Sequence, residues 1–424
     1  MKSIIIKEVG LTTAAKIATA IFAVLISLLI TRLSGKEAYG IISLSNQLLG
    51  FFIVVIIGGY YQHITRYIAR SRLSIESLFK IKGSITSIVS KRTLKITPLA
   101  LMIAWPLFVV QNESTQGLLV FSVLTIGLVF QVLSRINASI LLGLRKVWQS
   151  SWAENTSVNF IVCVLLITIY TISGQITITT IALIYVGARL VTYVATNVYL
   201  DRSINSRLNT EYNAAGDDIN HRELDANRSF AVISLTSYAY TLSSGMMLGL
   251  FGNLGNVGEY NIALKICSPL LFISSAIQRS YNPRIAKAYK ANNISYLKKS
   301  YLDLALAATV IFILFSTPVI LLKSDILALW QIDSPEMFNV LLILLTAHGL
   351  NIISANAGPI LTMTQYEKQH AQLNIVGLIV NIISTIALVY YFGITGAAWS
   401  YLLNIVFVNA AKGWLMLKLL LNEK

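Results

Sequence analysis

Charged side chains are scarce in this sequence. Only 12% of the 424 residues are Asp, Glu, Lys or Arg, against about 25% in an average soluble domain. Hydrophobic residues make up 55%, and apolar runs long enough to cross a hydrocarbon core of about 30 Å recur along the chain. The composition excludes a water-soluble globular protein and predicts an all-α polytopic membrane protein. We expect the first run to be a span and not a cleaved signal peptide, because no small-residue cleavage site follows it.

Cysteine and the motifs of enzymes are also scarce. Cys163 and Cys267 both lie inside apolar runs, which gives no disulfide framework and no metal-ligand spacing. There is no phosphate-binding glycine loop followed by lysine and serine, and the loops assigned to the outer side are too short for a catalytic domain. We therefore expect no enzyme activity, no metal and no cofactor.

Acidic residues are fewer than basic ones, 18 against 33, and the formal net charge is +15. The basic residues gather in alternate loops, which is the positive-inside pattern of a membrane protein and not a nucleic-acid-binding surface. The basic loops contain Arg66, Arg70, Arg72, Lys80, Lys82, Lys91, Arg92, Arg145, Lys146, Arg202, Arg207, Arg284, Lys287 and Lys298, among others. This pattern places both termini in the cytoplasm. The basic segment 73–91 is either a helix on the anionic inner leaflet or a solvated loop.

About twelve transmembrane helices are expected. They cover roughly 9–31, 39–61, 94–110, 117–142, 155–172, 178–200, 230–250, 257–277, 302–322, 337–363, 373–392 and 395–420. The hairpin at 9–72 has a second version at 229–289, in which Tyr39 aligns with Tyr260 and Arg66 with Arg284. We predict two six-helix bundles, 1–205 and 229–424, joined by a cytoplasmic linker at 206–228 and related by a pseudo-two-fold repeat around a central cationic cavity.

Five cations fall inside the predicted spans, and each costs at least about 2.5 to 3.5 kcal/mol there unless it meets water or a partner. They are Lys16, Arg135, Arg189, Lys265 and Lys412. Glu154 and Asp303 are placed near cytoplasmic ends, so deep acids are almost absent. Unpaired cations in a low dielectric favour an anionic ligand. The alternatives are snorkelling for Lys16 and Lys412, anchoring of a helix end for Arg135, and an intrabundle pair for Arg189.

The seventh predicted span has a stripe of hydroxyl groups at helical spacing. It consists of Ser234, Ser237, Tyr238, Thr241 and Ser244. Hydroxyls both donate and accept hydrogen bonds, which suits a sugar ligand. Hydrogen bonding between helices explains the stripe equally well.

Several segments resemble a known family. AAKIATA, SGKEAYGIISLSNQL, GGYYQHITRYIAR, LLGLRKVWQSSWAEN, VGEYNIALK and NPRIAKAY are similar to the Wzx-type flippases of the multidrug/oligosaccharidyl-lipid/polysaccharide exporter superfamily. The resemblance implies transfer of an undecaprenyl-diphosphate-linked oligosaccharide, such as an O-antigen repeat unit, across a bacterial inner membrane. It implies contact with membrane lipid, and a polysaccharide polymerase and a chain-length regulator as partners.

The resemblance also suggests residues that line the cavity. By this similarity spans one, two, seven and eight line it, which covers Lys16, Gln47, the hydroxyl stripe and Lys265. Arg135, Arg189 and Lys412 match no family motif residue by residue.

Other functions remain as alternatives. A multidrug or cation antiporter of the same superfamily would need acids deep in the cavity, and a lipid II flippase typically has more spans. A polysaccharide polymerase would need a large external loop, and a structural scaffold does not account for cations inside the membrane.

Overall fold

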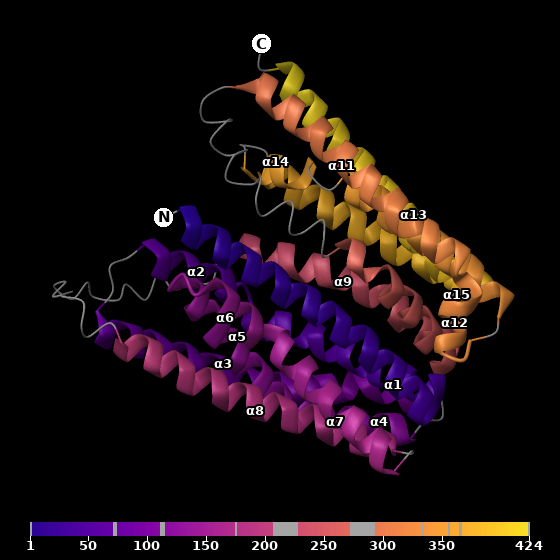
Figure 1. Ribbon diagram of the computed structural model, residues 1–424, viewed down its shortest axis with the longest axis horizontal. Coiled ribbons are helices and arrows are strands. Elements are labelled where there is room, and N and C mark those ends of the chain that lie inside the picture. Colours follow the sequence, from indigo (N-terminus) through magenta and orange to yellow (C-terminus); the bar gives the residue numbers. More distant parts are fainter. Residues whose placement is uncertain are drawn as a thin grey trace. The chain divides into compact units, whose positions relative to one another are not determined.

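The computed structural model describes residues 2–70, 74–110, 115–173, 176–206, 228–271, 293–332, 334–354, 357–363 and 367–422, and every element within these ranges is helical (Figure 1). The first elements are α1 (Lys2–Ile57), α2 (Tyr60–Arg70), α3 (Ile75–Trp105), η1 (Pro106–Val110), α4 (Thr115–Ile126) and α5 (Leu128–Gly143). They are followed by α6 (Val147–Ser151), η2 (Trp152–Thr156), α7 (Ser157–Ser173), α8 (Ile178–Asn205) and α9 (Arg228–Phe251). The last are α11 (Ile294–Leu321), α12 (Lys323–Leu329), α13 (Pro335–Ser354), α14 (Ala357–Met363) and α15 (Glu367–Asn422).

The chain forms two compact units. Unit 1 contains Met1–Ser34 and Ile41–Tyr238, and unit 2 contains Gly35–Gly40 and Ala239–Lys424. The boundary therefore falls inside α9, and a short piece of α1 belongs to unit 2. Most of the predicted linker, 207–227, lies outside the described residues.

Seven helices of the described chain are long and apolar enough to cross a membrane, or eight if α4 and α5, bent by 41°, form one span. Two of the seven are hairpins that fold back at a glycine with non-helical backbone angles, α1 at Gly35 and α15 at Gly393. Each has 56 residues, or about 84 Å at 1.5 Å per residue, which is long enough for two spans. Gly35 (φ 85°) and Gly393 (φ 54°) adopt left-handed φ values that side chains disfavour.

The basic segment 73–91 is helical over its described part and does not form a solvated loop. Ser74 accepts a hydrogen bond from the backbone N–H of Ser77 at 3.1 Å and caps α3, which then runs without interruption to Trp105. The loop alternative was wrong because a capped helix satisfies its own backbone groups. Nζ of Lys82 donates a hydrogen bond to Oδ1 of Asp201 on α8 at 2.5 Å.

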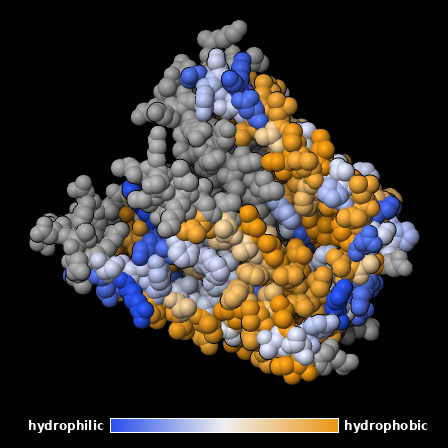
Figure 2. Space-filling view, viewed as in Figure 1, coloured by the Kyte–Doolittle hydropathy of each residue, from blue (hydrophilic) through white to orange (hydrophobic). Residues whose placement is uncertain are grey.

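Large hydrophobic side chains are exposed along the helices in both units. Leu94 and Met102 of α3 are 75% and 72% exposed, and Leu321 of α11 is 76% exposed. Figure 2 shows hydrophobic residues along the helices and hydrophilic residues gathered at helix ends. Such surface is unfavourable in water but matches lipid chains. The protein is a multi-pass membrane protein.

Polar side chains lie inside the units, and α5 is central to the packing of unit 1. It packs against α2, α3, α6 and α8 (Figure 1) and contains the buried Ser134, Asn137 and Ser139. In unit 2, α13 packs on α11 and α15, and α14 packs on α15.

The hairpin of α15 gives a stability test. A Cβ at Gly396 would lie 1.9 Å from the carbonyl oxygen of Leu388, while a Cβ at Gly413 of the same helix would meet nothing within 4 Å. Gly396→Ala should destabilise the protein by about 1 to 3 kcal/mol through this backbone clash. Gly413→Ala should be neutral or slightly stabilising. Thermal unfolding in detergent measures both, and equal midpoints would contradict the hairpin packing.

Candidate functional site

Arg189 of α8 is buried inside unit 1, with 3% of its surface exposed. Its Nη1 donates to the carbonyl oxygen of Leu124 at 3.0 Å and its Nη2 donates to Oδ1 of Asn46 at 2.7 Å. Leu124 lies near the end of α4, where the helix bends at Gly127 and the Leu124 carbonyl also accepts the N–H of Gly127 at 3.1 Å. A Cβ at Gly127 would lie 3.0 Å from Cδ of Arg189. The guanidinium thus caps a broken helix and joins it to α1.

Arg135 of α5 lies in a different environment. It is half-buried, its Nε is buried without a hydrogen-bond partner, and it lies within electrostatic range of Tyr61, Tyr238 and Arg189. The phenol of Tyr238 reaches the backbone of α1, because a Cβ at Gly50 would lie 1.7 Å from its oxygen. Unit 1 therefore brings together Arg135, Arg189 and Tyr238 of the predicted site.

Glu154 is a carboxylate beside this group, and its bond to Tyr61 was not predicted from the sequence. It lies on the π-helical turn η2, and its carboxylate accepts a hydrogen bond from the phenol of Tyr61 on α2. From the sequence, Glu154 is expected near a cytoplasmic helix end, where it meets water or neighbouring arginines, and Arg135 does lie within electrostatic range of its partner Tyr61. A π-turn adds one residue to a helical turn and rotates the side chains that follow, and such turns are frequent at functional sites.

The backbone of η2 is held by side chains. Ser134 of α5 donates to the carbonyl oxygen of Ala153 at 2.7 Å, and the hydroxyl of Thr156 donates to the carbonyl oxygen of Ser151 at 3.1 Å. The Thr156 hydroxyl also lies 2.6 Å from that of Thr19 on α1. These bonds satisfy carbonyl groups that the wider turn releases, so the position of Glu154 is fixed from three helices.

Lys16 and Gln47 are the other predicted site residues on α1. Both are half-buried and both have interactions with other groups. Thr19, one turn beyond Lys16, contacts η2 as described above and does not lie on a free polar face. The substrate-binding roles of Lys16 and Gln47 stay predictions.

In unit 2 the predicted residues are spread over two helical segments. Ser244 of α9 is 1% exposed and lies beside Tyr260, while Lys265 is half-buried in the helical segment 254–271. Lys412 of α15 is half-buried and lies within electrostatic range of His370. The side chains of Ser237 and Thr241 lie outside the described residues.

The hydroxyl groups of α9 make contacts between helices. Tyr240 donates to the carbonyl oxygen of Asn374 on α15 at 2.5 Å, and Ser243 donates to Oδ1 of Asn381 at 2.6 Å. In unit 1, Gln62 donates to Ser234 at 3.3 Å. Helix packing therefore uses part of this polar surface, and neither Tyr240 nor Ser243 was in the predicted stripe.

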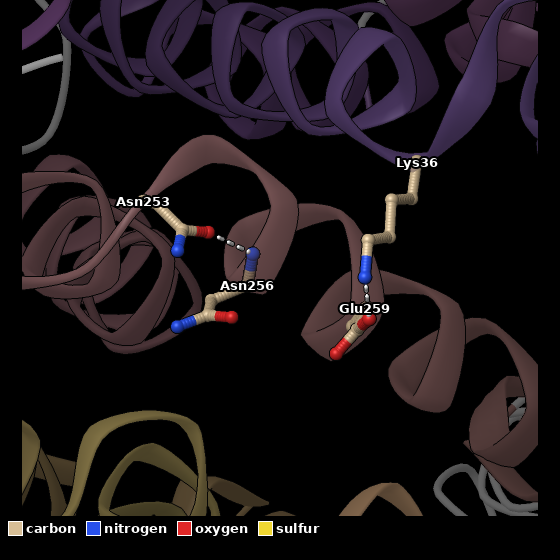
Figure 3. A network of polar contacts seen from close by, with 4 residues as sticks. All are labelled: Lys36, Asn253, Asn256 and Glu259. Carbon is tan, nitrogen blue, oxygen red and sulfur yellow. Dashed lines mark hydrogen bonds and ion pairs between the residues drawn. The ribbon is translucent and has the colours of Figure 1, made fainter. Parts of the chain in front are cut away.

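Three ion pairs are present among the described residues, and they join Lys36 to Glu259 (Figure 3), Lys80 to Glu76 and Lys82 to Asp201. None of them includes Arg135, Arg189, Lys265 or Lys412. The same part of the chain has no group of His, Cys, Asp or Glu that could hold a metal ion. In the described part of the chain, these four cations therefore have no carboxylate as an ion-pair partner.

Comparison with known proteins identifies the relatives of this chain. Residues 5–289 match the model of a family described as polysaccharide biosynthesis protein. No curated protein matches the chain.

Solved structures show the fold. An inward-facing multidrug resistance MATE family transporter of the MOP superfamily is 12% identical, with a TM-score of 0.77 over 97% of this chain and 99% of that chain. A MOP superfamily transporter from Pyrococcus furiosus, described as having a binding pocket of reverse polarity, is 15% identical, with a TM-score of 0.62 over 98% and 95%. An outward-facing MATE family transporter is 14% identical, with a TM-score of 0.61 over 98% and 96%. The prediction of an all-α polytopic membrane fold is confirmed.

The contact between Arg189 and Asn46 gives a second test. Asn46→Ala should cost about 1 to 3 kcal/mol of stability, because it leaves a buried guanidinium N–H without a partner. The double variant Asn46→Ala/Arg189→Met should cost less than the sum of the single variants, since both act on one bond. Unfolding midpoints of the four proteins measure this coupling. Strictly additive losses would show that the two side chains act independently.

Proposed function

The chain belongs to the polysaccharide biosynthesis protein family, and from that premise we propose that it is a flippase for an undecaprenyl-diphosphate-linked oligosaccharide, such as an O-antigen repeat unit. Transport runs from the cytoplasmic to the periplasmic leaflet of a bacterial inner membrane, with both termini in the cytoplasm. The observation that carries the proposal is that Arg135 and Lys265 are half-buried in helices and form no ion pair with a described carboxylate.

The charge of this substrate explains why cations are needed. A diphosphate carries roughly two negative charges, and moving it bare through a dry bilayer would cost several kcal/mol or more per charge. Positive side chains offset that cost. Moving about two negative charges out of a negative-inside cell is favourable by about 4 to 5 kcal/mol per 100 mV, so the membrane potential drives export.

Each predicted residue has a place in this proposal. Lys16 and Lys265 bind the diphosphate, and Arg135 and Lys412 extend the positive surface. Gln47 and the side chains of α9 bind sugar hydroxyls; these are Ser237, Tyr238, Thr241 and Ser244. Arg189 holds the framework around Arg135 through the bonds to Leu124 and Asn46. The prenyl tail stays in lipid, and the substrate passes by alternating access.

A cation antiporter of the same superfamily is the second candidate. It requires a carboxylate to bind the cation inside the membrane. Glu154 on η2 is a carboxylate within the helices of unit 1. The observation that favours this candidate is the hydrogen bond from Tyr61 to Glu154. Arg135 lies within electrostatic range of the same Tyr61, and its positive charge disfavours cation binding there, so the anionic substrate is the better assignment.

The roles of the two lysines can be tested in cells. Lys16→Ala/Lys265→Ala should lower surface polysaccharide about tenfold or more, the factor expected when roughly 1.4 kcal/mol of attraction to the diphosphate is lost. The amount of protein in the membrane should be unchanged.

The matched control removes two positive charges from exposed positions, Lys80 and Lys298. A strain with Lys80→Ala/Lys298→Ala should export polysaccharide normally, because charges exposed to water contribute little free energy to ion pairing. Immunoblots of the membrane fraction and of surface polysaccharide measure both outcomes. Full-length polysaccharide in the Lys16→Ala/Lys265→Ala strain would refute the assigned roles.

A further inference from the structure

Three cations lie at one end of unit 1, where α8 ends and where the chain passes from α5 to α6. They are Arg145, Lys146 and Arg202. The two places are joined directly, because Nζ of Lys146 donates to Oγ of Ser203 at 2.8 Å. We propose that this end of unit 1 binds one anionic phospholipid of the bilayer, which is not the transported substrate. The inference does not depend on the proposed function.

Lys146 is held by two neutral groups of α8. Besides its bond to Ser203, its ammonium lies 5.1 Å from the centre of the Tyr199 ring, and the phenol of Tyr199 accepts a hydrogen bond from Nε2 of Gln149 at 3.2 Å. An ammonium has three N–H donors, and neither a hydroxyl nor a ring neutralises its charge. In the described part of the chain no carboxylate pairs with Lys146. The site thus has a positioned cation whose charge is not cancelled.

The two arginines are exposed, and neither of them forms an ion pair with a described carboxylate. Arg145 has a φ of 64°, a conformation that is uncommon for residues other than glycine. Asp201, the residue before Arg202, accepts a hydrogen bond from Lys82 of α3 at 2.5 Å, so its charge is already paired. Positive charge is therefore in excess where α8 ends.

An exposed apolar stripe on α8 leads to the same place. Val191, Val194 and Val198 are 54%, 51% and 44% exposed, and their spacing of three and four residues puts them on one side of the helix. Tyr199, which is 38% exposed, and the exposed Arg202 continue this side to the end of α8. The surface changes from apolar through aromatic to cationic, which is the order that matches the acyl chain, the glycerol region and the phosphate of a phospholipid.

An anionic phospholipid fits both parts of this surface. Its phosphate accepts charge-assisted hydrogen bonds from ammonium and guanidinium groups, and each Lys or Arg near the membrane surface adds to the attraction for anionic lipid. A zwitterionic lipid offers the same acyl chains without net charge. The alternative role of these cations is to offset the negative end of the α8 dipole. That role requires no lipid, so dependence on lipid charge distinguishes the two.

Thermal unfolding of the purified protein in an uncharged detergent measures the binding. Phosphatidylglycerol should raise the midpoint above the value reached with phosphatidylcholine of the same chain length, because a ligand stabilises the state that it binds. In Arg145→Gln/Arg202→Gln the amount of phosphatidylglycerol that gives half of this rise should increase about tenfold or more. Glycerol phosphate should give no rise, because it has no acyl chain for the valines of α8.

The matched control is Lys91→Gln/Lys95→Gln, which removes the same charge from exposed positions on α3. It should keep the response to phosphatidylglycerol. An equal loss of response in Lys91→Gln/Lys95→Gln and in Arg145→Gln/Arg202→Gln would show a general attraction to basic residues and would overturn the site. Equal midpoints with the two phospholipids in the unsubstituted protein would overturn it too, and a rise with glycerol phosphate alone would identify a soluble ligand instead of a lipid.

Lys146 is tested by a pair of variants in the same assay. Lys146→Gln should weaken the response to phosphatidylglycerol about tenfold, whereas Lys146→Arg should keep most of it because the charge remains. A lower midpoint in Lys146→Gln that is the same with both phospholipids, with the preference for phosphatidylglycerol unchanged, would show a purely structural role and contradict the proposal. If Lys146→Gln does not fold, Arg145→Gln/Arg202→Gln decides the matter, because it changes only exposed side chains.

Discussion

Every backbone N–H and C=O inside a lipid bilayer needs a partner within the protein, and this requirement governs where the helices of this chain can break. At the bend between α4 and α5 the carbonyl of Leu124 accepts the N–H of Gly127 at 3.1 Å, and Arg189 supplies a second donor at 3.0 Å. The π-turn η2 releases the carbonyl of Ala153, which accepts the hydroxyl of Ser134. Arg189 and Ser134, which could be taken from the sequence for ligand-binding residues, therefore donate hydrogen bonds to backbone carbonyls where the helices are irregular.

The same requirement divides the buried cations into two kinds. The guanidinium of Arg189 donates to the carbonyl of Leu124 and to the side-chain amide of Asn46, so few of its N–H groups are available to a ligand. Arg135 and Lys265 make no ion pair with a described carboxylate. Glu154 accepts a hydrogen bond from the phenol of Tyr61, which also lies within electrostatic range of Arg135. The positive charge of Arg135 and Lys265 is thus not neutralised by any carboxylate in the described part of the chain.

Apolar run length and repeated segments predicted the helical hairpins and the lipid-facing surface, because these depend on composition and local pattern. The family was predicted from the resemblance of several short segments to a known family. The bend at Gly127 and the π-turn at Glu154 could not be predicted, because both depend on side chains from distant helices that replace lost backbone bonds. The membership of Gly35–Gly40 in unit 2 likewise depends on packing between repeats. The repeat itself was visible, but not that its two turns pack against each other.

The central claim is that these cations carry the charge of the substrate across the bilayer. Vesicles containing the purified protein would be loaded with an undecaprenyl-diphosphate-linked oligosaccharide, or with the same oligosaccharide on an uncharged prenyl chain, and translocation of each followed under a membrane potential. The account predicts fast movement of the diphosphate form alone, with a rate that increases when the potential favours outward movement of negative charge. Equal rates for the two lipids, or a rate for the diphosphate form that ignores the potential, would contradict it.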